Sequence, residues 1–148
     1  MPPLSIEAIN RGELLSVYRL EQQCFPQPWP YTAFEHHLDA PAFLVAKANG
    51  RVIAYVVGDL VDGFPGPVGH IKDLAVYPDH RRRGIASMLL SRALFLLEEE
   101  GAVRAELEVR QNNDGARTLY DAFGFSKRGI RPGYYADGED AIVMNRPF

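Results

Sequence analysis

The chemistry that this sequence can perform is most visible in a short basic run, Arg81-Arg82-Arg83-Gly84-Ile85-Ala86. A strand-like aliphatic run precedes it, and an apolar run of helix formers from Ile85 to Leu97 follows it. The first amide groups of such a helix have no partners within the helix and lie at the positive end of its dipole. Three arginines beside these amides predict an anion cradle, best suited to a phosphate or pyrophosphate.

Glu108 is the carboxylate best placed to act as a base. Val103 to Arg110 alternates apolar and polar residues, which predicts a strand with Glu106 and Glu108 on its polar face. Ligands of open α/β sheets settle beyond the carboxyl ends of strands, and Glu108 lies near that end. The alternative is a solvated strand residue paired with Arg104 or Arg110, and Glu106 competes for the same role.

Tyr120 is the candidate proton donor. It lies in a helical run that Asn113 or Asp114 is expected to cap, in register with Leu119 and Phe123, so a core aromatic is the simpler interpretation. A phenol at the edge of a cofactor cleft is also a suitable general acid, because its ordinary pKa of about 10 keeps it protonated at neutral pH.

Other reactive side chains offer less chemistry. Cys24 is the sole cysteine, so no internal disulfide can form, and it is expected to be a buried or loop thiol rather than a nucleophile. His36 and His37 are expected on a helix surface. No second cluster offers metal-ligand spacing, so the sequence predicts no metal site.

Size and composition narrow the classes of protein. The 148 residues, 47% of them hydrophobic, fit one globular domain over residues 1–148. A net charge of -3 gives no indication of a nucleic-acid partner. The start of the chain lacks a signal-peptide pattern, and no apolar run reaches membrane-spanning length. We therefore expect a soluble, cytoplasmic protein without a membrane partner.

The elements that must position these residues alternate between strand and helix patterns. The strands are expected near residues 4–9, 43–48, 52–60, 69–77, 103–110, 125–130 and 141–144, and the helices near 10–20, 32–38, 85–97 and 114–123. The order β-α-α-β-β-β-α-β-α-β-β predicts an α/β domain with a mixed, mostly antiparallel sheet flanked by helices. Two connections are strand-helix-strand crossovers of about the length that parallel pairing requires.

The chain resembles a known family in both its basic run and its element order. Arg81, Gly84 and Ala86 match the R/Q-x-x-G-x-G/A acetyl-CoA signature of the GNAT acyltransferases, and the element order is that of the GNAT fold. The second half resembles, more narrowly, the RimI-type ribosomal-protein-alanine N-acetyltransferases and the archaeal N-terminal acetyltransferases. This narrower resemblance is carried by Leu107-Glu108-Val109-Arg110, Asn113, Ala116, Leu119-Tyr120, Gly124-Phe125, Arg131, Tyr134-Tyr135 and Gly138-Glu139-Asp140-Ala141.

The resemblance implies roles for particular residues. Glu108 falls on the general base of the family and Tyr120 on its proton donor. The residues implied to bind acetyl-CoA are Leu74, Ala75, Val76, Arg81, Arg82, Arg83, Gly84, Ile85, Ala86, Ser87, Asn113 and Tyr120. Those implied to contact the acceptor are Trp29, Asp73, Tyr134 and Tyr135.

The implied activity is transfer of acetyl from acetyl-CoA to the N-terminal amino group of a protein, such as a ribosomal protein or nascent chains, by direct attack. Two alternatives remain open. A GNAT enzyme could instead acetylate a small-molecule amine or a lysine, although Trp29 and the Tyr134-Tyr135 pair resemble a peptide groove. A non-catalytic acetyl-CoA-binding module is the other, and the presence of Glu108 and Tyr120 argues against it.

Overall fold

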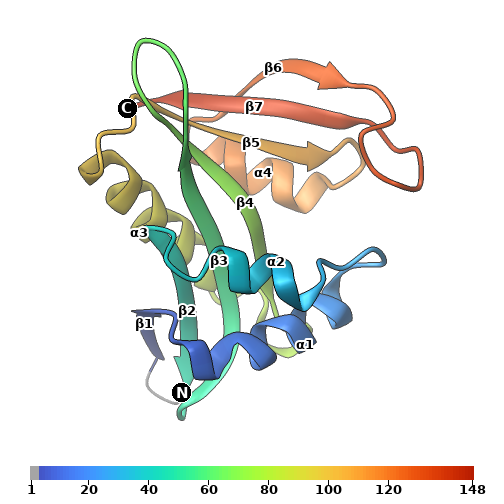
Figure 1. The fold of residues 1–148 in the computed structure, drawn as a ribbon. Helices are drawn as coiled ribbons and strands as arrows, with labels where there is room; N and C mark the ends of the chain where they lie inside the picture. Colours follow the sequence, from blue (N-terminus) through green and yellow to red (C-terminus); the bar gives the residue numbers. More distant parts are fainter. Residues whose placement is uncertain (1–3) are drawn as a thin grey trace.

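A seven-stranded sheet in the order β1-β2-β3-β4-β5-β7-β6 runs through the molecule (Figure 1). The computed structural model describes residues 4–148. The strands are β1 (Leu4–Ala8), β2 (Ala42–Ala48), β3 (Arg51–Val61), β4 (Val68–Val76), β5 (Arg104–Arg110), β6 (Ser126–Arg131) and β7 (Ala141–Pro147). The helices are α1 (Leu14–Cys24), α2 (Tyr31–His36), α3 (Ile85–Glu99) and α4 (Asp114–Ala122), with 3₁₀ turns at Arg11–Glu13 and Pro78–His80. The expected order of strands and α-helices is confirmed.

The sheet is mixed, but only one of the two expected crossovers produces a parallel pair. β4 and β5, joined through α3, pair in parallel, and all other neighbouring strands pair antiparallel. The expectation of a second parallel pair, through α4, is wrong because β7 lies between β5 and β6. β7 buries Ile142 and Met144, whereas β6 is largely exposed and polar, so β6 takes the edge position that polar strands tolerate.

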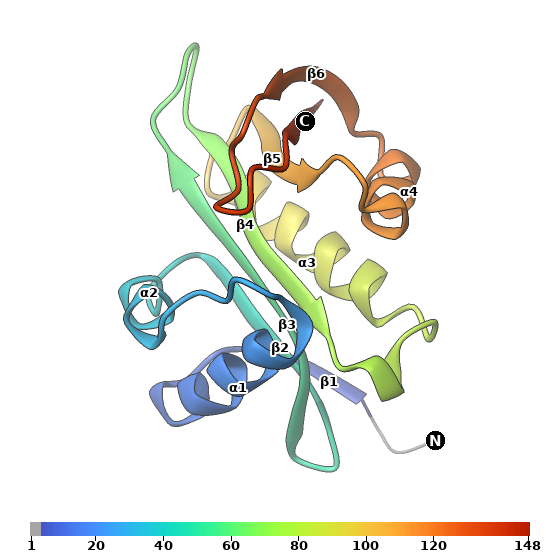
Figure 2. The same ribbon diagram turned by 90° about the vertical axis from the view of Figure 1, so that its right-hand side faces the viewer.

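Helices cover both faces of the sheet, with α1 and α2 on one side and α3 and α4 on the other (Figure 2). Phe34 of α2 packs against Tyr55 of β3 on the first side, and both are fully buried. On the other side, α3 approaches β4 closely because Gly69 has no side chain; a Cβ there would lie 3.0 Å from Leu97. None of the helices within residues 4–148 is long and apolar enough to cross a membrane.

The sheet opens between β4 and β5. Their parallel pairing ends where Ile71 meets Leu107, although β4 continues to Val76 and β5 to Arg110. The opening therefore lies at the carboxyl ends of two parallel strands, which is where open α/β sheets bind their ligands.

Candidate active site

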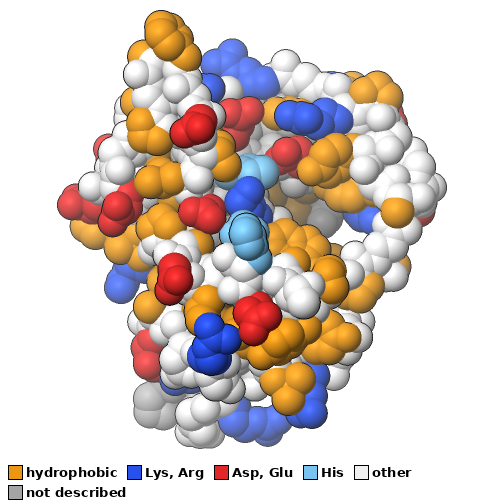
Figure 3. Space-filling model, in the orientation of Figure 1, with side chains coloured by type: hydrophobic (Ala, Val, Ile, Leu, Met, Phe, Trp, Pro, Cys, Tyr) orange, Lys and Arg blue, Asp and Glu red, His pale blue; other side chains and the backbone are white. Residues whose placement is uncertain are grey.

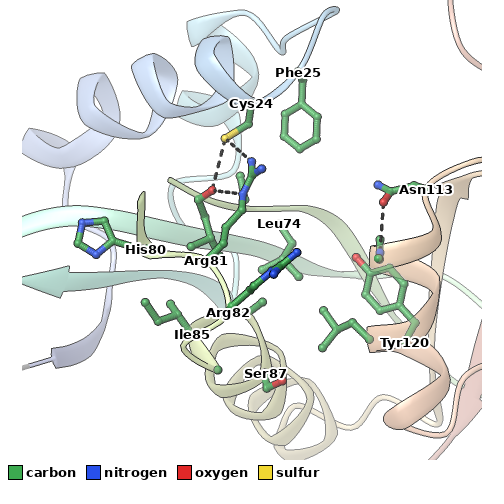
Figure 4. A pocket seen from close by; sticks show the side chains of 17 residues that line it. Cys24, Phe25, Leu74, His80, Arg81, Arg82, Ile85, Ser87, Asn113 and Tyr120 are labelled. Atoms are coloured by element: carbon green, nitrogen blue, oxygen red, sulfur yellow. Dashed lines mark hydrogen bonds between the residues drawn. The ribbon is translucent and has the colours of Figure 1, made fainter. Parts of the chain in front are cut away.

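Two cavities meet at the opening between β4 and β5. The first, of about 610 Å³, extends toward the start of α3 and is shown in Figure 4. The second, of about 290 Å³, extends toward the α1–α2 loop and the β6–β7 loop. The residues that line both cavities are Phe25, Leu74, Asn113, Ala116 and Tyr120. The two cavities therefore adjoin at these residues.

The first cavity gathers almost all the residues expected to bind acetyl-CoA. Those that line it are Leu74, Ala75, Val76, Arg81, Arg82, Gly84, Ile85, Ala86, Ser87, Asn113 and Tyr120. Arg83 is not among its lining residues, and its Nη1 lies 3.5 Å from Nδ1 of His80. Of the six residues from Arg81 to Ala86, all but the third therefore line the cavity.

The backbone at the start of α3 is shaped to expose its amides. Gly84 is the residue before the helix and has a φ of 75°, in the left-handed region that glycine adopts without steric cost. Arg82 also lies in this region, with a φ of 64°, which is a strained conformation for a side chain of its size. Ile85, Ala86 and Ser87 form the first turn of α3 and line the cavity, so its unpartnered amides lie at the cavity wall.

The Arg81 side chain points toward α1 rather than along the start of α3 (Figure 4). Its Nε donates to the Val76 carbonyl at 3.1 Å, and its Nη2 lies 3.6 Å from the Cys24 sulfur. Burial raises the pKa of Cys24 despite the nearby guanidinium, so the thiol stays protonated. No group of three or more potential metal ligands occurs within residues 4–148.

Asn113 and Tyr120 lie on α4 at the junction of the cavities. Asn113 caps the helix, since its Oδ1 accepts a hydrogen bond from the Ala116 amide at 3.2 Å; of the two expected caps, Asn113 is the correct one. Tyr120 packs against Phe125 with ring centroids 5.8 Å apart. Burial raises the pKa of Tyr120 above its ordinary value, and Asp73, when ionised, raises it further. Tyr120 is therefore both a core aromatic and a cavity residue.

Glu108 lines the second cavity and has a mostly buried side chain, 14% exposed. Its Oε2 lies 2.7 Å from Nε2 of His70, which projects from the neighbouring strand β4. Glu106, the competing carboxylate, lines neither of these cavities and forms an ion pair with Arg104 at 3.5 Å. The geometry thus separates two carboxylates that the strand pattern left equivalent.

His70 is the partner of Glu108 that the sequence pattern did not reveal. The ammonium nitrogen of Lys72 lies 3.1 Å from Nδ1 of His70. An ammonium can only donate, so we assign the tautomer in which Nδ1 accepts and Nε2–H donates to Glu108. Burial acts to raise the pKa of Glu108, but the hydrogen bond from His70 and the nearby positive charges of Arg131 and Lys72 lower it overall. Glu108 is therefore ionised at neutral pH.

The second cavity also gathers the residues expected to contact an acceptor: Trp29, Asp73, Tyr134 and Tyr135 line it. In the space-filling view, histidine side chains and a basic side chain gather in a hollow at the centre of one face (Figure 3). Burial raises the pKa of Tyr135 to about 12, so its phenol is protonated at neutral pH.

Arg110 joins the loops that wall the second cavity. Its Nη1 donates to Asp137 at 2.9 Å and to Glu139 at 2.8 Å, and its Nη2 reaches Gln27 at 3.4 Å. Its guanidinium also lies 4.1 Å from the ring centre of Tyr135. One side chain at the end of β5 thus ties the α1–α2 loop to the β6–β7 loop.

The fold and the paired cavities define an acyltransferase of the GNAT type. The chain matches the model of the Acetyltransferase (GNAT) family over residues 14–125, and it belongs to this family. It is similar to an N-alpha-acetyltransferase of Saccharolobus solfataricus, with 35% identity over 142 residues that cover 88% of this chain and 85% of that protein.

A second relative bears the narrower name. The [ribosomal protein bS18]-alanine N-acetyltransferase of Salmonella typhimurium is 33% identical over 151 residues, which cover 97% of each chain. The crystal structure of the ribosomal-protein-S18-alanine N-acetyltransferase from Escherichia coli matches with a TM-score of 0.85 and 30% identity, covering 98% of this chain and 94% of that one. The resemblance stated from the sequence is confirmed.

Proposed function

We propose that this protein transfers the acetyl group of acetyl-CoA to the α-amino group of a protein N-terminus. One observation carries the proposal: Tyr120 stands where the two cavities meet, and Glu108 lies in the wall of the second. A base on the acceptor side and an acid at the junction are what direct transfer between two bound substrates needs. The N-alpha-acetyltransferase relatives support the same activity.

Acetyl-CoA is assigned to the first cavity. The free amides of Ile85 to Ser87 and the guanidinium of Arg82 suit its pyrophosphate, because a helix N-terminus favours anions. The backbone of Leu74 to Val76 would hold the pantetheine arm. Pairing of β4 with β5 ends at Ile71, so the backbone groups of Leu74 to Val76 are not paired with β5. Arg81 would act mainly by bracing Val76, the end of β4.

Glu108 would act as the general base. An N-terminal amine has an ordinary pKa of about 7.7 to 8.0, so much of it is protonated at neutral pH and must lose a proton before it can attack. The carboxylate of Glu108 is ionised at that pH and would take this proton, directly or through a water molecule. His70 would hold the carboxylate in place through its Nε2–H.

The transfer itself needs no covalent enzyme intermediate. The neutral amine attacks the thioester carbonyl, whose oxygen the backbone at Leu74 to Val76 would polarise. When the carbon–sulfur bond breaks, Tyr120 would donate its proton to the departing sulfur. Cys24 is not required, in keeping with its protonated thiol.

The acceptor is assigned to the second cavity. Trp29 from the α1–α2 loop and Tyr134 from the β6–β7 loop supply aromatic lining, and Asp73 lines the cavity next to Leu74. A ribosomal protein or a nascent chain is the proposed acceptor, supported by the names of the relatives. Such acceptors fit a cytoplasmic location.

A panel of acceptors tests this function. The protein is incubated with acetyl-CoA and with peptides that have free N-termini, blocked N-termini or internal lysines. A parallel set of reactions contains small amines such as polyamines in place of a peptide. Acetyl located by mass spectrometry on the α-amino group of free N-termini supports the proposal. Acetyl found only on lysine or on small amines overturns it in favour of the first alternative. Cofactor binding without any transfer favours a binding module.

His70 should control how readily Glu108 ionises. We expect His70→Leu to lower kcat by about tenfold to a hundredfold, the range for loss of one hydrogen bond to a charged group. Because His70 depresses the pKa of Glu108, its loss raises that pKa, and the acidic limb of the kcat–pH profile moves to higher pH. His70→Gln, which keeps an N–H donor, should recover part of both effects. If His70→Leu and His70→Gln lose the same kcat and shift the acidic limb equally, the hydrogen bond has no such role.

A further inference from the structure

Three side chains form a hydrogen-bonded chain at the second cavity, and the proposed reaction uses none of their hydrogen bonds. Tyr55 of β3 lies between Glu21 of α1 and Asp73 of β4; its hydroxyl is hydrogen-bonded to Oε1 of Glu21 and lies 3.0 Å from Oδ2 of Asp73. Glu21 is 2% exposed and Tyr55 is fully buried. Both carboxyl groups line the cavity.

The number of protons in this chain follows from its hydrogen bonds. Two hydrogen bonds link three oxygens in series, and each needs its own proton. Burial and the two carboxyls raise the pKa of Tyr55, so it keeps its single proton and can donate only once. The second bond must therefore be donated to the Tyr55 oxygen by a protonated carboxyl. Two ionised carboxylates on either side of one hydroxyl would leave one contact without a proton.

The surroundings indicate which carboxyl is protonated. The second oxygen of Glu21 accepts the Trp29 amide at 2.8 Å, so an ionised Glu21 has a donor on each oxygen. Asp73 receives one backbone donor, the Leu74 amide, at 2.9 Å on Oδ1. Burial, followed by the neighbouring Glu21 carboxyl, raises the pKa of Asp73 well above its usual range.

We propose that Asp73 is a neutral carboxylic acid at neutral pH, donating through Tyr55 to an ionised Glu21, and that it is a positioning residue for the proton transfer by Tyr120. This proposal rests on the proposed function. The order of donors runs from Asp73 to Tyr55 to Glu21. The titratable groups around Asp73 are Glu21 and Cys24 from α1, Tyr55 from β3 and Tyr120 from α4.

The protonation state of Asp73 matters to Tyr120 because the two are close enough to interact electrostatically. A negative charge on Asp73 makes the Tyr120 phenol a weaker acid and also opposes negative charge on the departing sulfur. A neutral Asp73 removes both effects. When Asp73 ionises at alkaline pH, the transfer of the Tyr120 proton should therefore become slower.

Two isosteric variants should move activity in opposite directions. In Asp73→Asn, the amide N–H donates to Tyr55 just as the carboxylic acid would, and the side chain cannot ionise. In Glu21→Gln, the amide oxygen can accept from Trp29 while its N–H donates to Tyr55, which reverses the chain and ends it on an ionised Asp73. The alkaline limb of the kcat–pH profile should move up in Asp73→Asn and down in Glu21→Gln, by about one pH unit or more.

Shifts in the same direction for both variants, or a downward shift in Asp73→Asn, would overturn the proposal. If Asp73 had a purely structural role, its replacement would lower stability, and the alkaline limb of the kcat–pH profile would not move in opposite directions in the two variants. Thermal unfolding of each variant, followed at the same pH values, separates loss of fold from a change in protonation.

Infrared difference spectra test the protonation state without any activity. Wild-type protein at neutral pH should show the carbonyl stretch of a protonated carboxylic acid, and both Asp73→Asn and Glu21→Gln should lack it. Absence of the band in wild-type protein overturns the proposal even if N-terminal acetylation is confirmed. If the band behaves as expected but no peptide is acetylated, the proposed function fails and the protonated Asp73 stands.

Discussion

Replacing Glu108 by glutamine should lower kcat on the order of 10² to 10⁴-fold, the contribution of a general base, while leaving acetyl-CoA binding nearly intact. The separation is expected because Glu108 lines the second cavity and not the first. Glutamine keeps the size of the side chain and can still accept the His70 N–H, so the fold should survive. Initial rates with a free N-terminal peptide measure the loss.

The matched control for this variant is Glu106→Gln on the same face of β5. Glu106 lines neither cavity, and its carboxylate is paired with Arg104, so its loss should leave kcat close to that of the wild type. Binding of acetyl-CoA to each variant can be measured by isothermal titration calorimetry. Equal loss of turnover and of cofactor binding in Glu108→Gln would indicate a structural role.

The pH dependence of the same variant gives a second check. A base is needed most when the acceptor is an ammonium and least when it is already a neutral amine. The defect of Glu108→Gln should therefore be larger at about pH 7 than at about pH 9, on either side of the ordinary pKa of an N-terminal amine. A defect that is constant with pH would contradict removal of the ammonium proton by Glu108.

One wall of the first cavity was predictable because its residues are close together in the sequence. The strand end, the basic run and the first turn of α3 are consecutive, so the chain itself brings Val76, Arg82 and Ser87 to one wall. Asn113 could be placed at the start of α4 because a capping side chain has a local signature. For these residues, proximity in the sequence was enough to predict proximity in the fold.

The contacts between strands were not predictable in the same way. His70 meets Glu108 only because β4 and β5 pair in parallel with a particular register, and no local pattern states that register. The position of β7 between β5 and β6 likewise depends on which strand has more apolar area to bury. Both features depend on hydrogen-bonded pairing between strands that are not adjacent in the sequence.

Glu21 is an instructive intermediate case. It follows Leu14 and Val17 at helical spacing, so the sequence places an acidic residue in the buried stripe of α1. That signal indicates a buried carboxylate with partners, since an unpaired one would be costly. It does not indicate Tyr55 or Asp73, which come from two other strands.

Tyr120→Phe should reduce kcat by a factor on the order of 10², while acetyl-CoA affinity and stability change little. The phenyl ring can keep the packing of Tyr120 against Phe125, and only the donor to the departing sulfur is removed. The raised pKa of Tyr120 means that the group is always protonated at neutral pH, so the wild-type rate should not fall through its own ionisation there. Single-turnover rates at saturating acetyl-CoA isolate this step from product release.

The leaving group provides the sharpest test of that role. A thiolate of low basicity can depart without taking a proton, so acetyl thioesters of more acidic thiols should depend less on Tyr120. The ratio of wild-type to Tyr120→Phe rates should therefore fall steadily as the pKa of the leaving thiol falls. A ratio that is independent of the thiol would show that Tyr120 only shapes the cavity, and the proton would then have to come from another donor at the junction of the two cavities.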